Sequence, residues 1–103
     1  MNNDLFSKLQ EARQKIEEAK IRLNSIIVEV EARGGGLKVR ANANKTIVGF
    51  EFTDEFLNSH SRVEVEDVLL ATTNRALEQA AQRGETEMKN ITQGLLPDFP
   101  GLV

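Results

Sequence analysis

The strongest pattern in this sequence is a heptad spacing of apolar residues near its start. Steps of four and three residues alternate along the set Leu5, Leu9, Ala12, Ile16, Ala19, Leu23 and Ile26. Such spacing is typical of the seam of an α-helix that packs against another helix. Since no Pro or Gly occurs before residue 34, we predict a helix over about residues 3–25, roughly 35 Å long. A helix of this length in a chain of 103 residues must protrude or pair with a second long helix.

After this helix the apolar period changes from heptad spacing to two. Residues 28–32 alternate between apolar and charged side chains, as in a strand with one face in water. Gly34–Gly36 then predicts a hairpin connection, because Gly adopts positive φ at adjacent positions without steric cost. Two further alternating runs, 37–42 and 46–52, follow with a polar turn between them, and Gly49 indicates a bulge or a close backbone approach. Together these runs predict an antiparallel meander of three strands.

A second long helix is predicted in the last third of the chain. Residues 53–61 are polar and are interpreted as a loop with at most one helical turn around 54–57. Ser61 and Glu64 have the spacing of a capping box, in which each side chain binds a free backbone N–H at a helix start. The apolar spacing then continues to about residue 92 through Gly84, which costs about 1 kcal/mol relative to Ala or allows another backbone to approach closely.

Length and composition fit a single domain. Of the 103 residues, 40% are hydrophobic and 28% charged, as in ordinary globular chains. We predict an α+β domain over residues 1–93, with a long N-terminal helix, a three-stranded antiparallel meander and a long C-terminal helix. Residues 94–103 form a Pro- and Gly-containing tail that is expected to be ordered only if a groove accepts Leu96 and Phe99. A domain of this size buries only roughly 60–65% of its unfolded surface, which favours oligomerisation.

Residue types that most enzymes use are scarce. The absence of Cys, Tyr and Trp, with His60 as the single histidine, argues against disulfides, Cys nucleophiles and His-rich metal centres. His60 lies in a polar stretch and is interpreted as a solvent-exposed loop residue, and Gly34–Gly36 lacks the Lys-Ser/Thr of a phosphate-binding loop. We expect no catalytic residue, cofactor, metal or small-molecule substrate, and hence no enzyme. No apolar run reaches the roughly 18–20 residues of a membrane span and no signal-peptide pattern occurs, so we expect a cytoplasmic protein without membrane contact.

Charge is distributed unevenly along the chain. The net charge is −3, yet residues 1–45 hold nine basic and six acidic side chains and the remainder holds four and ten. In the first predicted helix every basic residue flanks the apolar seam: Lys8, Lys15 and Arg22 follow one side, and Arg13 and Lys20 the other. These cations either pair with acids of the second helix or form two basic stripes that contact phosphates, with steps of about 10.5 Å along a stripe. The acids available for pairing are Glu66, Asp67, Glu78, Glu85 and Glu87.

The order of these features resembles the YbaB/EbfC family of nucleoid-associated proteins. The resemblance covers essentially the whole chain and rests on an ordered set of segments, none of which is specific alone. These segments are the Leu/Gln/Glu/Lys-rich helix Leu5–Leu23, the strand Val28–Ala32 leading into Gly34–Val39, the helical Leu69–Leu77, and the closing Met88–Pro97 with its Met, Thr and Gly-Leu-Leu-Pro.

The resemblance implies a homodimer in which the sheets meet at the centre and long helices project to grip or bend duplex DNA. It implies no catalysis, metal or cofactor. Carried over to this sequence, the family's suspected DNA surface corresponds to Lys8, Arg13, Lys15, Lys20 and Arg22, with Arg75, Arg83 and Lys89 as second-rank candidates.

We therefore expect a nucleoid-associated homodimer that binds duplex DNA with little sequence specificity and alters its conformation. Such binding would affect gene expression, nucleoid organisation and DNA protection. The alternative is a dimeric adaptor that binds replication or recombination proteins through its helices or the tail segment 96–99. In this alternative DNA contact is incidental. The net charge of −3 favours it, as would pairing of the cations of the first helix with acids of the second.

Overall fold

The fold of the chain is given by a computed structural model, which describes residues 2–95. The elements in chain order are helix α1 (Asn2–Arg22), 3₁₀ turn η1 (Leu23–Ser25), strand β1 (Ile27–Ala32), 3₁₀ turn η2 (Arg33–Gly35), strands β2 (Leu37–Asn42) and β3 (Thr46–Phe52), helix α2 (Asp54–Ser59) and helix α3 (Arg62–Leu95). This order confirms the predicted α+β fold with its long first and last helices. Helix α3 continues two residues past 93, and the tail from 96 onward lies outside the described residues.

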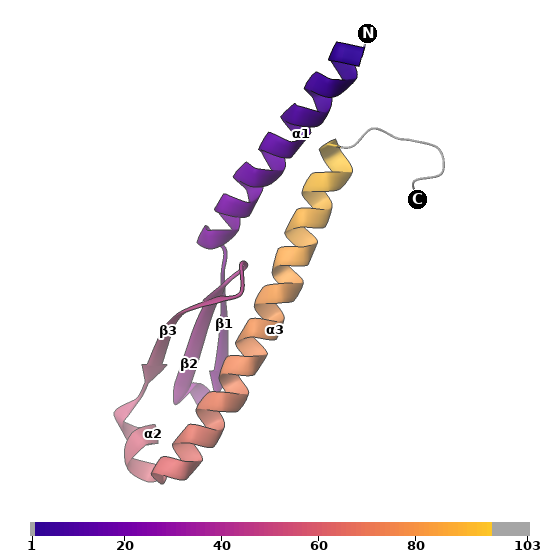
Figure 1. Cartoon of the computed structure of the whole chain (residues 1–103). Helices are drawn as coiled ribbons and strands as arrows, with labels where there is room; N and C mark the ends of the chain where they lie inside the picture. Colours follow the sequence, from indigo (N-terminus) through magenta and orange to yellow (C-terminus); the bar gives the residue numbers. More distant parts are fainter. Residues whose placement is uncertain (1, 96–103) are drawn as a thin grey trace.

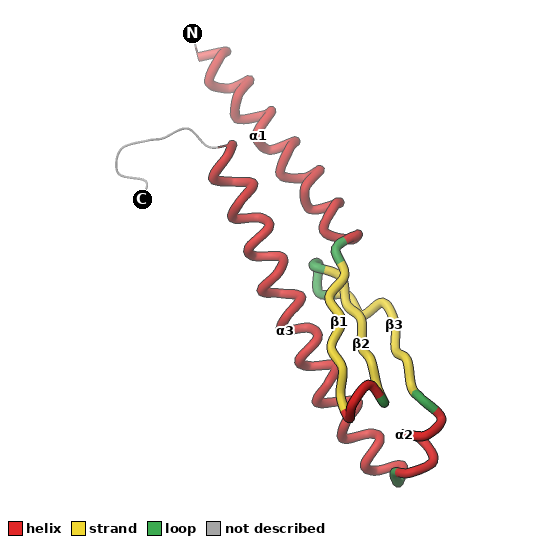
Figure 2. The backbone as a smooth tube through the Cα atoms, turned by 180° about the vertical axis from the view of Figure 1, so that it is seen from behind, coloured by secondary structure: helices red, strands yellow, loops and turns green. Residues whose placement is uncertain are grey.

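The molecule is long and narrow. Helix α3 runs along the sheet and then continues beside α1, which extends away from the sheet past the last described turn of α3 (Figures 1 and 2). The overall extents are 69 × 24 × 18 Å and the radius of gyration is 19.8 Å. A compact domain of this length would have a radius of gyration of about 13 Å. The fold therefore consists of a packed body around the sheet and a projecting helical part.

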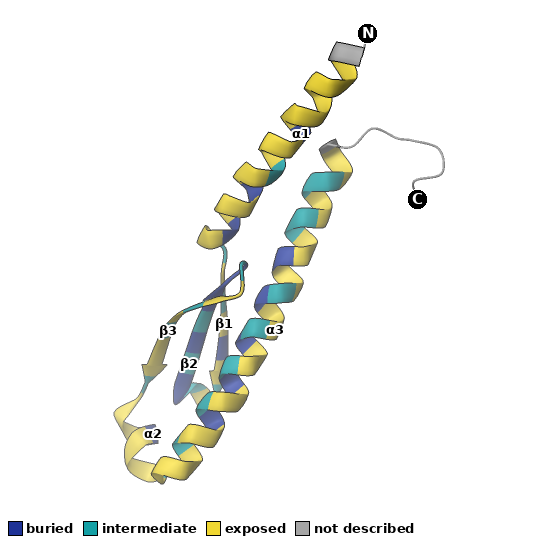
Figure 3. Ribbon diagram, in the orientation of Figure 1, coloured by how far each residue is buried: buried dark blue, intermediate teal, exposed yellow. Residues whose placement is uncertain are grey.

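The core lies between α3 and one face of the sheet. The strands pair antiparallel in the order β1-β2-β3, and β2 in the middle is the most buried strand (Figure 3). Because side chains alternate along a strand, Val28, Val30 and Ala32 of β1 and Leu37, Val39 and Ala41 of β2 point to α3, whereas Ile27 lies on the outer face and is 47% exposed. The buried residues of this core are Val30, Leu37, Val39, Ala41, Phe56, Val68, Ala76 and Ala80.

Strand β3 contains the irregularity that Gly49 indicated. Gly49 lies opposite Arg40, while the next β2 residue, Ala41, lies opposite Ile47. Val48 is therefore the extra residue of a bulge, and its side chain is 50% exposed. The bulge prediction is confirmed, with the extra residue directly beside the glycine.

The segment between the sheet and α3 is more helical than expected. Residues 54–59 form a complete short helix, α2, where a loop with at most one turn was predicted. The Thr53 hydroxyl caps α2 by accepting a hydrogen bond from the Phe56 N–H at 3.1 Å, and Phe56 is buried against the sheet. His60 lies in the bend after α2, as predicted for a loop residue, but it is half-buried rather than solvent-exposed: its Nδ1 donates to the Phe56 carbonyl at 2.9 Å and its ring packs on the Phe56 ring.

Helix α3 starts at the predicted capping box. The Ser61 hydroxyl accepts from the Glu64 N–H at 3.2 Å, and the Glu64 carboxylate accepts from the Ser61 N–H at 3.2 Å. The hydrogen bonds from the backbone and side chain of Ser61 hold the pKa of Glu64 below its ordinary value. The first turn of α3 is therefore fixed by both side chains.

Candidate nucleic-acid interface

All five basic residues of α1 have exposed side chains. The members of one stripe are seven residues apart, which on an α-helix brings them to nearly the same direction about 10.5 Å apart along the axis. Their orientation follows from the seam between the stripes, where Ala12, Ala19 and Leu23 are buried. The exposed residues are Lys8, Arg13, Lys15, Lys20 and Arg22.

Only the sheet-proximal half of the α1 seam is covered. Ala19 is fully buried, whereas Leu5 and Leu9 are each 51% exposed. Residues 4–11 are all exposed, so within the described part of the chain nothing packs on the outer turns of the helix. We call α1 the arm, because its outer turns project from the rest of the molecule (Figure 1).

Grooves beside the α1–α3 contact are lined by the basic residues of both stripes. Lys15 and Arg22 line a groove of about 450 Å³ together with Glu18 of α1 and with Asn90, Ile91 and Gly94 of α3. Lys20, from the other stripe, lines a second groove of about 320 Å³ near Gly84. The two stripes therefore run on either side of the line along which the helices touch.

Two of the five cations of the arm pair with acids of their own helix. Lys15 lies 3.3 Å from the Glu11 carboxylate, and Lys20 lies 3.3 Å from that of Glu17. These side chains are all more than half exposed, and such surface pairs contribute about 0–1 kcal/mol each. They restrain the cations weakly and leave them accessible to phosphate.

Pairing between the arm and α3, one of the two interpretations of the basic stripes, is not observed. Among residues 2–95 no ion pair joins α1 to α3. Glu66 pairs with Arg62 and Glu87 with Arg83, each within α3. Of the acids predicted as partners, Glu85 lines a groove with Lys20 but forms no ion pair with it, whereas Glu66 and Glu87 lie within reach of arginines of α3 itself.

The second-rank cations do not form a common surface. Arg75, Arg83 and Lys89 are exposed. At about 100° per residue, Arg75 and Lys89 point within about 40° of each other but lie about 21 Å apart along α3, and Arg83 points about 80° away from Arg75. Arg83 is also held by Glu87 at 2.9 Å. Helix α3 contains four basic and six acidic residues, so it is net negative. The structure thus brings together the candidates on α1 and not those on α3.

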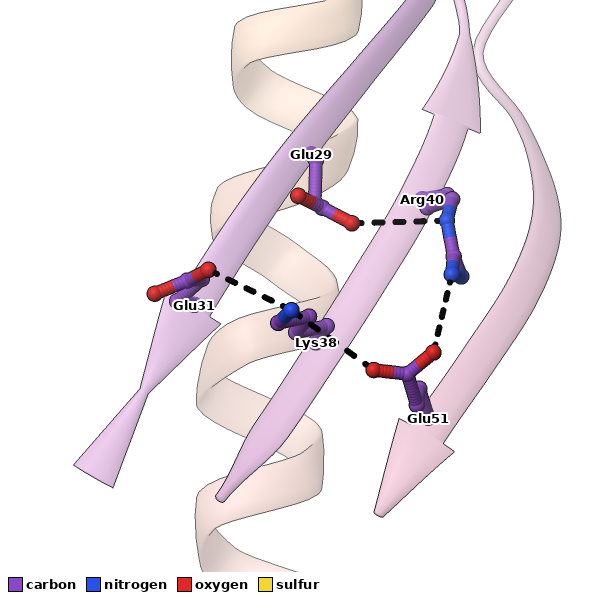
Figure 4. Close-up of polar contacts among 5 residues, drawn as sticks. All are labelled: Glu29, Glu31, Lys38, Arg40 and Glu51. Carbon is purple, nitrogen blue, oxygen red and sulfur yellow. Dashed lines mark hydrogen bonds and ion pairs between the residues drawn. The ribbon is translucent and has the colours of Figure 1, made fainter. Parts of the chain in front are cut away.

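The cations on the outer face of the sheet are neutralised by acids. Lys38 lies between Glu31 at 3.8 Å and Glu51 at 3.6 Å, and Arg40 lies between Glu29 at 3.4 Å and Glu51 at 3.2 Å (Figure 4). Three carboxylates surround two cations, so this face has no excess positive charge. It is a poor surface for phosphates compared with the arm.

One further cation lies next to the arm because of the fold. Lys45, in the turn between β2 and β3, is exposed and lines the same groove as Lys20. Sequence reasoning did not select it, since its distance from Lys20 depends on how the sheet meets the helix. The polar turn around 42–45 was the only local signal.

Metal sites and membrane spans are two other features that residues 2–95 do not contain. No group of three or more His, Cys, Asp or Glu side chains in this range is arranged to hold a metal ion. In the same range no helix has the length and apolar character needed to cross a membrane.

The fold and its exposed cations define an elongated α+β protein whose basic surface lies on a projecting helix. The sequence model of the YbaB/EbfC DNA-binding family matches residues 1–95, and the chain belongs to this family. A nucleoid-associated protein of Flavobacterium johnsoniae is 30% identical over 98 residues, covering 95% of this chain and 91% of the relative. One from Thermoanaerobacter pseudethanolicus is 32% identical over 100 residues, covering 97% and 88%.

A solved structure supports the fold independently. An uncharacterized protein from Helicobacter pylori superposes with a TM-score of 0.62 at 18% identity, over 90% of this chain and 94% of that one. At this identity the likeness concerns the fold alone.

Proposed function

We propose that this protein acts in the cytoplasm as a nucleoid-associated homodimer that binds duplex DNA through the phosphate backbone. The observation that carries the proposal is the pair of basic stripes on α1, which are exposed and make no ion pair with another element among the described residues. Contacts to phosphates position a protein on DNA but carry no sequence information, so we expect little sequence specificity.

The proposed dimer has separate support from exposed apolar side chains of the body. Phe50 lies opposite buried Val39, hence on the face that α3 covers, yet it is 48% exposed at the β3 edge. On α3, Val63 and Leu70 are seven residues apart and 57% and 64% exposed. Apolar groups in such positions are typical of association surfaces. A second copy would cover them, and a monomer mass that is independent of concentration in light scattering would contradict the dimer.

Two arms on one dimer would contact a duplex at two places. A protein that holds DNA at separated points favours the DNA shape that fits both contacts, and the cost depends on how easily the duplex deforms. We infer that this is how binding alters DNA conformation. Effects on gene expression, nucleoid organisation and DNA protection would follow from coverage of the duplex.

The test is a titration of the protein into a fluorescent duplex of about 30 bp, followed by anisotropy at several salt concentrations. We expect log K to fall linearly with log salt. In K8Q/R22Q the slope should decrease by about 0.9 for each phosphate that the variant no longer neutralises. The matched control is R33Q/R62Q, which removes the same charge at the other end of the molecule and should leave the slope unchanged. An equal effect of both variants would contradict the arm as the binding surface.

The exposed apolar residues of the arm favour one alternative function. Leu5, Phe6 and Leu9 are 51%, 61% and 51% exposed, as in a surface that docks on another protein. In that case the dimer is an adaptor for replication or recombination proteins. Absence of duplex binding even at about 50 mM salt would favour the adaptor, because phosphate contacts are strongest at low salt.

A further inference from the structure

The turn between β2 and β3 is bonded to the end of the arm. The Asn44 side-chain amide Nδ2 donates to the backbone carbonyl of Lys20 at 2.9 Å and to the Asn24 side-chain oxygen at 2.6 Å. The last four carbonyl groups of an α-helix have no partner within it, and Lys20 is among them in α1. Asn44, which belongs to the sheet, therefore provides a hydrogen-bond donor for a backbone carbonyl at the end of the arm.

A second bond attaches the same turn to the connection between α1 and β1. The Ala43 N–H donates to the carbonyls of Leu23 at 3.2 Å and Ile26 at 2.9 Å. Leu23 and Ala43 are each 4% exposed, so this contact is shielded from water. Hydrogen bonds in such surroundings are costly to break, because the groups left behind are buried without partners.

The turn itself is held rigid by a third asparagine. The Asn42 side-chain oxygen accepts from the Asn44 N–H at 2.9 Å and the Thr46 N–H at 3.2 Å, and Asn42 is 7% exposed. Its backbone carbonyl accepts from the Lys45 N–H at 3.0 Å. Asn44 is thus presented to the arm by a turn whose own backbone is fixed.

Helix α3 closes the other side of the turn. A Cβ placed on Gly84 would overlap the carbonyl oxygen of Ala43, so the two backbones are in direct contact there. The turn is wedged between α3 and the base of α1. Farther out, the arm touches α3 through residues such as Ala12 and Ala19, whose small side chains restrain its direction less.

From these contacts we propose that the β2–β3 turn sets the direction of the arm, with Asn44 as its positioning residue. The inference rests on the proposed function, in which the arm contacts DNA. Asn44 does not need to touch DNA for this role. It fixes where Lys8, Lys15 and Arg22 lie relative to the body, so that several cations reach phosphates at once.

The chain offers a matched pair of variants for the test. Asn44→Asp replaces the amide donor by a carboxylate, which cannot donate to Lys20 and repels the Asn24 oxygen. Asn24→Asp introduces the same charge across the same contact but keeps the Asn44 donor, which then binds a carboxylate. Any effect of charge alone on DNA binding is therefore shared by the two variants.

The arm direction is measured without DNA. Because the chain has no Cys, spin labels attach specifically at S7C on α1 and Q79C on α3, both at exposed positions. Labelled protein is mixed with an excess of unlabelled protein, so that pulsed EPR reports distances within one protomer. We expect a broadened or shifted distance distribution in N44D and the parent distribution in N24D. An unchanged distribution in N44D would overturn the inference.

Duplex affinity is then measured on the same substitutions without labels. We expect N44D to bind roughly three- to tenfold more weakly than N24D, the factor that corresponds to the preorganisation supplied by one to two hydrogen bonds. Equal affinities despite a changed distribution would overturn the positioning role.

Two failures of the experiment can be told apart. If the parent itself does not bind DNA, the proposed function fails while the distance experiment still decides whether the turn directs the arm. If N44D does not fold, N24A, which removes one of the two bonds, should give a smaller change of the same kind, and parent-like behaviour would again count against the inference.

Discussion

The body around the sheet buries large side chains, whereas the arm buries small ones. Leu37 and Val39 are fully buried beneath α3, while the contact between α1 and α3 depends on Ala12 and Ala19, with Leu23 at its base. The body therefore holds most of the apolar burial that stabilises the fold. The arm is a single helix whose outer turns have no cover among the described residues. In this molecule the region that provides stability and the region that presents positive charge are separate.

The separation matters because contact with DNA phosphates requires exposed charged side chains, whereas a buried core requires apolar side chains. A charged side chain is rarely buried without a partner, since desolvation costs more than it returns. On the arm, the alternation of a narrow apolar seam with flanking cations satisfies both requirements on one helix. Substitutions in the body should thus change unfolding more than DNA binding, and those on the arm should do the reverse.

The largest expected effect comes from the centre of the body. Leu37→Ala removes a fully buried side chain and should lower the free energy of unfolding by about 2–5 kcal/mol. Leu9→Ala on the arm deletes the same atoms from a side chain that is 51% exposed and should cost less than about 1 kcal/mol. Denaturant unfolding of both variants measures the difference. Similar decreases would mean that the outer seam is covered in solution.

A second pair of variants tests the contact between body and arm. Gly84→Ala forces a Cβ against the Ala43 carbonyl and should destabilise by about 1–3 kcal/mol despite the better helix propensity of Ala. Gly94 has nothing within 4 Å of such a Cβ, so Gly94→Ala should be neutral or stabilising by up to about 1 kcal/mol. Thermal melting shows whether each substitution lowers or raises the stability of the protein. A stabilised Gly84→Ala would show that α3 does not press on the turn.

Much of the fold was predictable because its signals are local. Heptad spacing, period-two alternation, the glycine turn and the Ser61–Glu64 box each involve residues close in sequence, and the helices and strands appear where these patterns placed them. The short α2 was underestimated because its start depends on a cap by Thr53 and its burial on a single phenylalanine, Phe56.

The candidate interface was predictable only in part. The stripes on α1 follow from periodicity, but whether their cations face acids depends on where α3 passes, which no local pattern reports. Asn44 and Lys20 are 24 residues apart in sequence, and the two interpretations of Gly84 differ only in whether Ala43 lies against it. Such contacts are set by the packing of helix on sheet.

The capping box gives a smaller effect that is confined to the body. Ser61→Ala removes the acceptor for the Glu64 N–H and should cost about 1 kcal/mol. Since the folded-state pKa of Glu64 is lowered from 4.5, its ionised form stabilises the fold above about pH 4.5, and this contribution is lost as the pH falls through the folded pKa. Ser61→Ala keeps the backbone N–H, the larger cause of the lowered pKa, and removes the hydroxyl, so the parent should lose slightly more stability on acidification than Ser61→Ala does, as measured by denaturant unfolding at several pH values. Ser7→Ala on the arm should behave as the parent, and identical pH dependence in all three proteins would contradict the box.

The smallest expected effect concerns Lys45, which lies where the two regions meet. Lys45 is in the β2–β3 turn of the body, and it lines the same groove as Lys20 of the arm. If DNA runs along the arm to its base, Lys45→Gln should reduce the salt slope of duplex binding by about 0.9, the value for one phosphate contact. Lys38→Gln removes the same charge from the outer face of the sheet, where two carboxylates already neutralise it, and should leave the slope unchanged. Equal slopes for Lys45→Gln and the parent would restrict the interface to the arm, whereas a reduced slope for Lys38→Gln would extend it over the body and remove the separation between the two regions.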